Sequence, residues 1–68
     1  MNEDNLNMEI RKFLKKVGIT SQRIIENHIR KADNNGTIKA GDEIILNVTL
    51  SIKNFQSSDT IDGKITIE

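Results

Sequence analysis

The feature of this sequence that most constrains its fold is a change in the spacing of apolar residues near the middle of the chain. Apolar residues recur at helical spacing from Leu6 to Ala32 and alternate strictly from Ile44 to Ile67. The first period is typical of amphipathic helices, and the second is typical of strands with one buried face. The sequence therefore predicts an α+β fold in which a helical half is followed by a β-hairpin.

The helical half is predicted to form two helices, at residues 4–17 and 21–33. Gly18 is a common C-terminal stop, and either Thr20 or Ser21 can cap the helix that follows. Each helix has an apolar arc that predicts a core-facing side. The arc of the first helix holds Leu6, Ile10, Phe13, Leu14 and Val17, and that of the second holds Ile24, Ile25, His28, Ile29 and Ala32.

Two long strands are predicted at residues 43–53 and 60–68, with a loop at 54–59 and a short extra strand at 37–39. One face of the hairpin is predicted to hold Ile44, Leu46, Val48, Leu50, Ile52, Ile61, Ile65 and Ile67. Phe55 is expected to fold over the end of the core, and Gly63 indicates a closely packed helix or a bulge. Because an isolated hairpin is marginal in water, its apolar face needs a cover. The predicted single domain, residues 1–68, is a two-helix hairpin packed on one face of an antiparallel β-hairpin (ααββ).

Composition excludes several classes of function. The chain has no cysteine and one histidine, so it offers neither disulfides nor thiolate metal ligands. His28 is explained by a partly buried imidazole bonded to a nearby acceptor, with a pH-sensing or catalytic role as the alternative. We predict no catalytic residue, no metal and no cofactor. The acidic start and the absence of a long apolar run predict a cytoplasmic protein without a membrane partner.

The net charge of zero hides an uneven distribution of charge. Residues 1–40 hold eight Lys/Arg against five Asp/Glu, giving +3, and residues 41–68 hold two against five, giving −3. Such asymmetry can attract an acidic partner to the helical half, or the hairpin of a second copy. The residues predicted to bind a partner are those of the outer helix faces, namely Arg11, Lys12, Lys15, Lys16, Arg23, Asn27, Arg30 and Lys31.

Two motifs suggest more specific functions. Residues 33–38 resemble the middle of a calcium-binding EF-hand loop, but Lys31 would occupy the first ligand position and Asp42 the twelfth, so a helix cap and turn explains them better. Residues 11–31 resemble a helix-turn-helix with Gly18 in the turn. The hairpin would then act as a wing, although Leu14 and Asn27 depart from the pattern.

The N-terminal residues Met1-Asn2-Glu3-Asp4 and the run from Ile10 to Arg23, IRKFLKKVGITSQR, also resemble a family of small uncharacterised bacterial proteins of about this length. The resemblance implies a bacterial cytosolic origin and supplies no catalytic residue.

The sequence thus predicts a non-enzymatic interaction module. It would bind a protein partner or itself, as a homodimer, through an exposed strand edge or the basic helix face. The alternative is a winged-helix-like nucleic-acid-binding protein that uses residues 21–33 to contact the nucleic acid.

Overall fold

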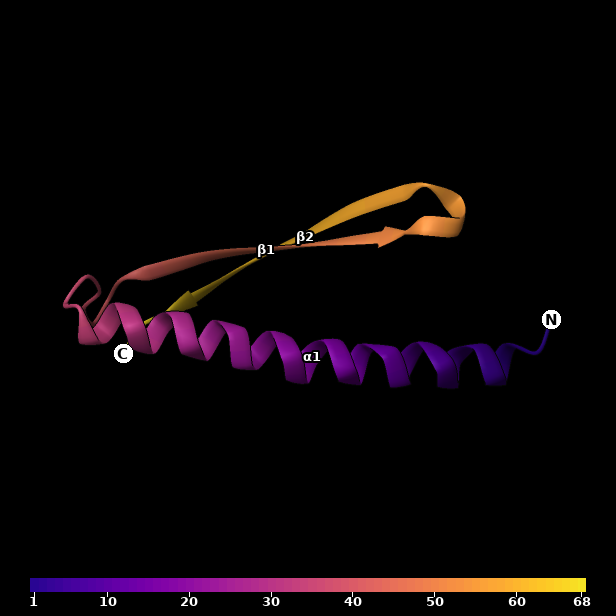
Figure 1. The fold of residues 1–68 in the computed structure, drawn as a ribbon, viewed down its shortest axis with the longest axis horizontal. Helices are drawn as coiled ribbons and strands as arrows, with labels where there is room; N and C mark the ends of the chain where they lie inside the picture. The colour runs from indigo at the N-terminus through magenta and orange to yellow at the C-terminus, as the bar shows by residue number, and fades with distance from the viewer. The chain divides into compact units, whose positions relative to one another are not determined.

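The computed structural model describes residues 1–68 and confirms the α+β class. Its elements, in chain order, are the helix α1 (Glu3–Asn34), the strand β1 (Glu43–Ile52), the 3-10 turn η1 (Lys53–Phe55) and the strand β2 (Ser57–Thr66) (Figure 1). The chain forms two compact units, Met1–Asn35 and Gly36–Glu68. The first unit is a lone helix and the second is a lone hairpin.

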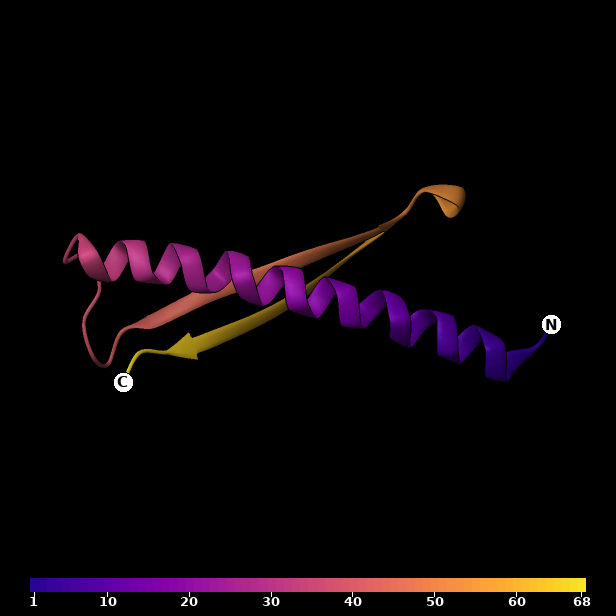
Figure 2. The same ribbon diagram turned by 60° about the horizontal axis from the view of Figure 1, so that its bottom comes forward.

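The helical half is one helix of 32 residues, so the predicted pair of helices at 4–17 and 21–33 is wrong. Figures 1 and 2 show α1 as one uninterrupted helix, and Gly18 is helical within it. The reason lies in the phase of the two predicted arcs. Val17, Ser21 and Ile24 stand at i, i+4 and i+7, so the arcs on either side of Gly18 continue one another along a single face. Glycine inside a helix costs only about 0.5–1 kcal/mol relative to alanine.

Both ends of α1 have residues that favour ending a helix. The side chain of Asn2 accepts a hydrogen bond of 3.0 Å from the backbone N–H of Asn5, which satisfies one free donor of the first turn. Glu3 and Asp4 lie in that turn and complement the helix dipole. At the other end Gly36 has a φ of +70°, a conformation in which glycine is favoured. The predicted end of the helical half near residue 33 is therefore confirmed.

Replacing Gly18 with alanine is expected to raise the free energy of unfolding by about 0.5–1 kcal/mol. A Cβ added at Gly18 meets no atom within 4 Å, and its φ is not positive, so the methyl group adds helix propensity without a clash. Urea unfolding followed by circular dichroism measures the change. If Gly18 instead ended a helix in the left-handed conformation, the substitution would lower the free energy of unfolding, because alanine is strained in that conformation.

β1 and β2 form a two-stranded antiparallel sheet with an unbroken register from Glu43 opposite Thr66 to Ile52 opposite Ser57. The predicted hairpin is confirmed, but β1 ends at 52, β2 spans 57–66, and residues 37–39 form no strand. The loop is therefore shorter than predicted, with η1 and Gln56 in the left-handed conformation at a φ of 52°. Phe55 is 76% exposed, so its predicted place over a core is wrong. The ladder passes through Gly63 opposite Leu46 without a bulge.

The bulge lies instead at the entrance to β1. Gly41, with a φ of +94°, donates its N–H to the carbonyl of Ile67 at 2.7 Å, and Ile67 donates to the carbonyl of Asp42 at 2.8 Å. Two residues just before β1 thus oppose one residue just after β2, with glycine first, which is the pattern of a G1 bulge. The Asp42 carboxylate also accepts a hydrogen bond of 3.0 Å from the N–H of Lys39. These bonds fix where the ladder begins.

No side chain of the chain is buried, whether apolar or polar. A helix alone has no interior, and a two-stranded sheet alone has two open faces, so neither unit can form a core by itself. The predicted packing of the helical half on the sheet stays a prediction. Each unit presents an apolar surface that lacks a cover within that unit.

Candidate partner-binding surfaces

The first such surface is an apolar stripe along α1, made possible by the continuity of the helix. At about 100° per residue its members fall within an arc of about 160°. We call it the α1 stripe, and it consists of Leu6, Ile10, Phe13, Leu14, Val17, Ile24, Ile25, Ile29 and Ala32. Val17, Ile25, Ile29 and Ala32 are half-buried, and the others are exposed. His28 falls within the same arc but is exposed, so its predicted partial burial is wrong.

The eight residues predicted to bind a partner are all exposed on α1. The single helix brings five of them onto one side, opposite the stripe, since they fall within about 60° of arc. These five, which we call the basic side, are Lys12, Lys16, Arg23, Asn27 and Arg30. Arg11, Lys15 and Lys31 lie outside that arc. The basic side therefore runs through both halves of the helix, which the two-helix prediction did not anticipate.

Two cations of the basic side form ion pairs with acidic residues of the same helix. Glu26 accepts hydrogen bonds of 2.8 Å from the Gln22 amide and 2.8 Å from the Arg30 guanidinium. The bond from Gln22 and then the bond from Arg30 hold the pKa of Glu26 below its ordinary value. Lys12 lies 4.0 Å from Glu9, a weak and exposed pair. The most strongly held cation of the basic side is therefore Arg30, whereas Lys16 and Arg23 form no ion pair.

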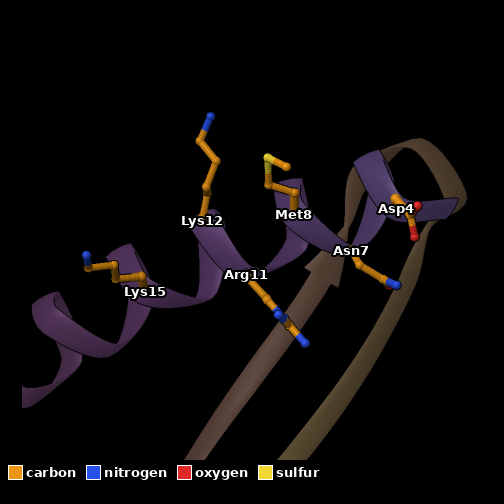
Figure 3. Close-up of a pocket in the computed structure, with 6 residues that line it drawn as sticks. All are labelled: Asp4, Asn7, Met8, Arg11, Lys12 and Lys15. Atoms are coloured by element: carbon orange, nitrogen blue, oxygen red, sulfur yellow. The ribbon is translucent and has the colours of Figure 1, made fainter. Parts of the chain in front are cut away.

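A shallow depression on α1 includes three of the predicted basic residues, Arg11, Lys12 and Lys15, together with Asp4, Asn7 and Met8. Figure 3 shows these side chains diverging from a single helix, with Met8, Lys12 and Lys15 to one side and Asp4, Asn7 and Arg11 to the other. Sites for small molecules are concave and enclose most of the ligand surface. Side chains that diverge from one helix cannot enclose a ligand, so this depression is part of an open surface.

The second surface is one face of the sheet. Cross-strand partners share a face in an antiparallel pair, so the register places Ile44 beside Ile65 and Val48 beside Ile61. We call this the apolar sheet face, and its apolar members are Ile44, Leu46, Val48, Leu50, Ile52, Ile61 and Ile65. The opposite face is polar apart from Ile45, which is 73% exposed, and it carries an ion pair of 3.5 Å between Lys64 and Glu43.

The sequence prediction missed Asp59, because it assigned this residue to the loop. In the structure Asp59 lies in β2 opposite Leu50, so its carboxylate stands on the apolar sheet face. The signal was present in the sequence: Asp59 has the same parity as Ile61 and Ile65, and extending the alternation backwards by two residues places it beside them.

The third surface consists of the two outer edges of the sheet. Ile67 donates to the carbonyl of Asp42, so that carbonyl points toward β2, and the direction then alternates along the strand. The even-numbered residues of β1 therefore bond to β2, and the backbone groups of Ile45, Asn47 and Thr49 point away from it. By the same alternation Thr60 and Asp62 of β2 point away from β1. Each edge offers unpaired backbone donors and acceptors.

Three further features of the structure concern metal ligands, the segment that resembles a calcium-binding loop, and membrane-spanning helices. No three His, Asp or Glu side chains gather where they could hold a metal ion. Asp33 and Asn34 belong to the last turn of α1, so the segment that resembles a calcium loop is a helix end. No helix in the structure combines the length and the apolar character needed to cross a lipid bilayer.

Comparison with known protein families gives a match over the whole chain. A family model described as "Family of unknown function (DUF6494)" matches residues 1–68. The resemblance to a family without known function is thereby confirmed. No curated protein and no solved structure matches the chain.

Proposed function

This chain belongs to the DUF6494 family, whose function is unknown, and we propose that it is a non-enzymatic interaction module whose partner is a second copy of itself. One observation carries the proposal, namely that neither unit buries a side chain by itself although each presents a long apolar surface. Apolar surfaces of this extent on small proteins mark sites of association. The α1 stripe and the apolar sheet face are the surfaces that association would cover.

Charge favours a second copy over an unrelated acidic protein. The helical unit, Met1–Asn35, carries seven Lys/Arg against five Asp/Glu, a net charge of +2, and the hairpin unit, Gly36–Glu68, carries three against five, a net charge of −2. The helix of one copy thus attracts the hairpin of another. These charges are small, so they assist the approach of two copies and leave burial of the apolar surfaces as the main source of stability.

The alternative based on a helix-turn-helix loses its structural basis. Residues 11–31 belong to one helix, so no second helix is set at an angle across a turn, as major-groove reading by this motif requires. Binding to nucleic acid would have to use the basic side of a straight helix, on which Glu26 holds Arg30. Binding of nucleic acid is therefore one of the results that would contradict self-association in the test below.

The test is the dependence of the melting temperature and the molar mass on protein concentration. Because folding and association are linked, the melting temperature of a self-associating chain rises with concentration. We expect a rise of several degrees between about 5 and 500 μM, and light scattering should give a mass of at least two chains at the upper end. A monomeric mass with a constant melting temperature would overturn the proposal. A duplex DNA that binds with a steep salt dependence while the protein stays monomeric would do the same.

A further inference from the structure

The two edges of the sheet differ in how well they can accept another strand. β1 carries one charged residue, Glu43, at its first position, whereas β2 carries Asp59, Asp62 and Lys64 in its interior. Charged residues on an edge strand, above all those on the apolar face, discourage pairing. Asp59 is such a residue, because a strand added to β2 would enclose its carboxylate on the apolar sheet face. The β2 edge is thus protected, and the β1 edge is open.

The sequence of β1 is also complementary to itself. When two β1 strands pair antiparallel, the apolar faces of both copies stay on the same side only if residues of equal parity stand opposite each other. The register centred on Val48 satisfies this condition. It places Leu46 opposite Leu50 and Ile44 opposite Ile52, and on the polar face it places Asn47 opposite Thr49. Every position of the apolar sheet face in β1 then meets another apolar residue.

We propose that two copies pair through the free edges of β1, antiparallel, with Val48 of one copy opposite Val48 of the other. The backbone directions agree with this register. Asn47 and Thr49 point their N–H and C=O groups away from β2, so they form the hydrogen-bonded pairs between the copies. Val48 falls at a pair without backbone hydrogen bonds, where Cα atoms approach to about 4.5 Å and side chains lie closest. The result is a four-stranded sheet in the order β2, β1, β1, β2.

The four-stranded sheet explains why the partner at the β1 edge is a second copy of this chain. A two-stranded hairpin is marginal in water, whereas a sheet of three or more strands with an apolar face can be stable. Pairing about Val48 doubles the apolar sheet face and makes it continuous across the two copies, which gives two α1 stripes a broad surface to cover. This inference rests on the proposed function and adds to it the edge, the direction and the register.

Cysteine scanning tests the register directly, because the chain contains no cysteine. Under mild oxidation Val48→Cys is expected to form a disulfide-linked dimer, since the Cα atoms of opposed residues lie within the range that a disulfide spans. The matched control is Leu46→Cys, also on the apolar face of β1. Its two copies stand four residues apart along the paired strands, too far for a bond. We expect Val48→Cys to cross-link at least about tenfold faster; equal rates would overturn the register.

A second pair of variants tests the edge. Thr49 and Thr60 stand opposite each other in the sheet, and both point their N–H groups outward, one at each edge. Proline is tolerated at such positions in an isolated hairpin, because no ladder bond is lost. Thr49→Pro is expected to raise the dissociation constant of the dimer at least about 100-fold, since it removes a central donor. Thr60→Pro is expected to leave the constant within about threefold of its original value.

The outcomes separate this inference from the proposed function. A wild-type dimer that Thr60→Pro weakens as much as Thr49→Pro overturns the β1 edge but leaves self-association standing. A wild-type monomer at all concentrations overturns both. If Thr49→Pro fails to fold, the cross-linking rates of Val48→Cys and Leu46→Cys still decide the register.

Discussion

Replacing Ile24 with aspartate is expected to destabilise the protein by about 2–4 kcal/mol, whereas the same replacement at Ile19 is expected to cost less than about 1 kcal/mol. The two isoleucines lie in the same helix and are almost equally exposed, at 53% and 52%. They differ in side: Ile24 belongs to the α1 stripe, and Ile19 lies on the opposite side of α1. A carboxylate at position 24 would stand inside the surface that the proposed association covers, and one at position 19 would stay in water.

The two variants change charge and helix propensity equally, so each serves as the control for the other. Chemical unfolding of both variants at one fixed protein concentration measures the difference, since stability depends on concentration in an associating protein. Equal losses at the two positions would show that the stripe is not covered, and would contradict the proposed function.

The second large effect is expected at the sheet. Leu46→Asp should abolish association and lower the free energy of unfolding by about 3 kcal/mol or more, because it places a charge at the centre of the apolar sheet face. Ile45→Asp should cost less than about 1 kcal/mol. Ile45 is the adjacent residue but points to the polar face, and it is 73% exposed. The measurement is molar mass by light scattering together with urea unfolding.

The contrast between neighbours makes this test independent of strand propensity, since aspartate is unfavourable in a strand at both positions. A loss of association with Ile45→Asp alone would mean that the polar face, and Ile45 in particular, is the surface that binds. Loss with neither variant would mean that the sheet takes no part in assembly.

The sequence predicted the hairpin well because its period of two is long and regular. Strict alternation from Ile44 to Ile52 determined the faces of β1, and the register in the structure agrees with it. The start of β2 could not be predicted with the same accuracy. Ser57 and Ser58 have the composition of a loop, and only pairing with Ile52 and Ser51 makes them strand. Cross-strand bonds thus decided what local preference could not.

The helical half was predicted as helical but was divided incorrectly. Gly18 carries a real local preference for ending a helix, and the prediction gave that preference more weight than the phase of the residues around it. Val17, Ser21 and Ile24 keep the 3.6-residue period across the glycine. The absence of proline and an apolar arc that stays in phase across Gly18 are the signals that could have predicted one helix. The basic side, with residues from both predicted helices, followed from the same correction.

The charges of β2 also determine where growth would stop. A chain that offered two open edges could add copies without limit and form a fibre. In the proposed dimer, pairing through β1 would use the open edge of each molecule and leave the two β2 edges outward, each carrying Asp59, Asp62 and Lys64. Such a dimer would be closed by its own two-fold symmetry, so a chain rich in exposed isoleucine would stop at two copies and not polymerise.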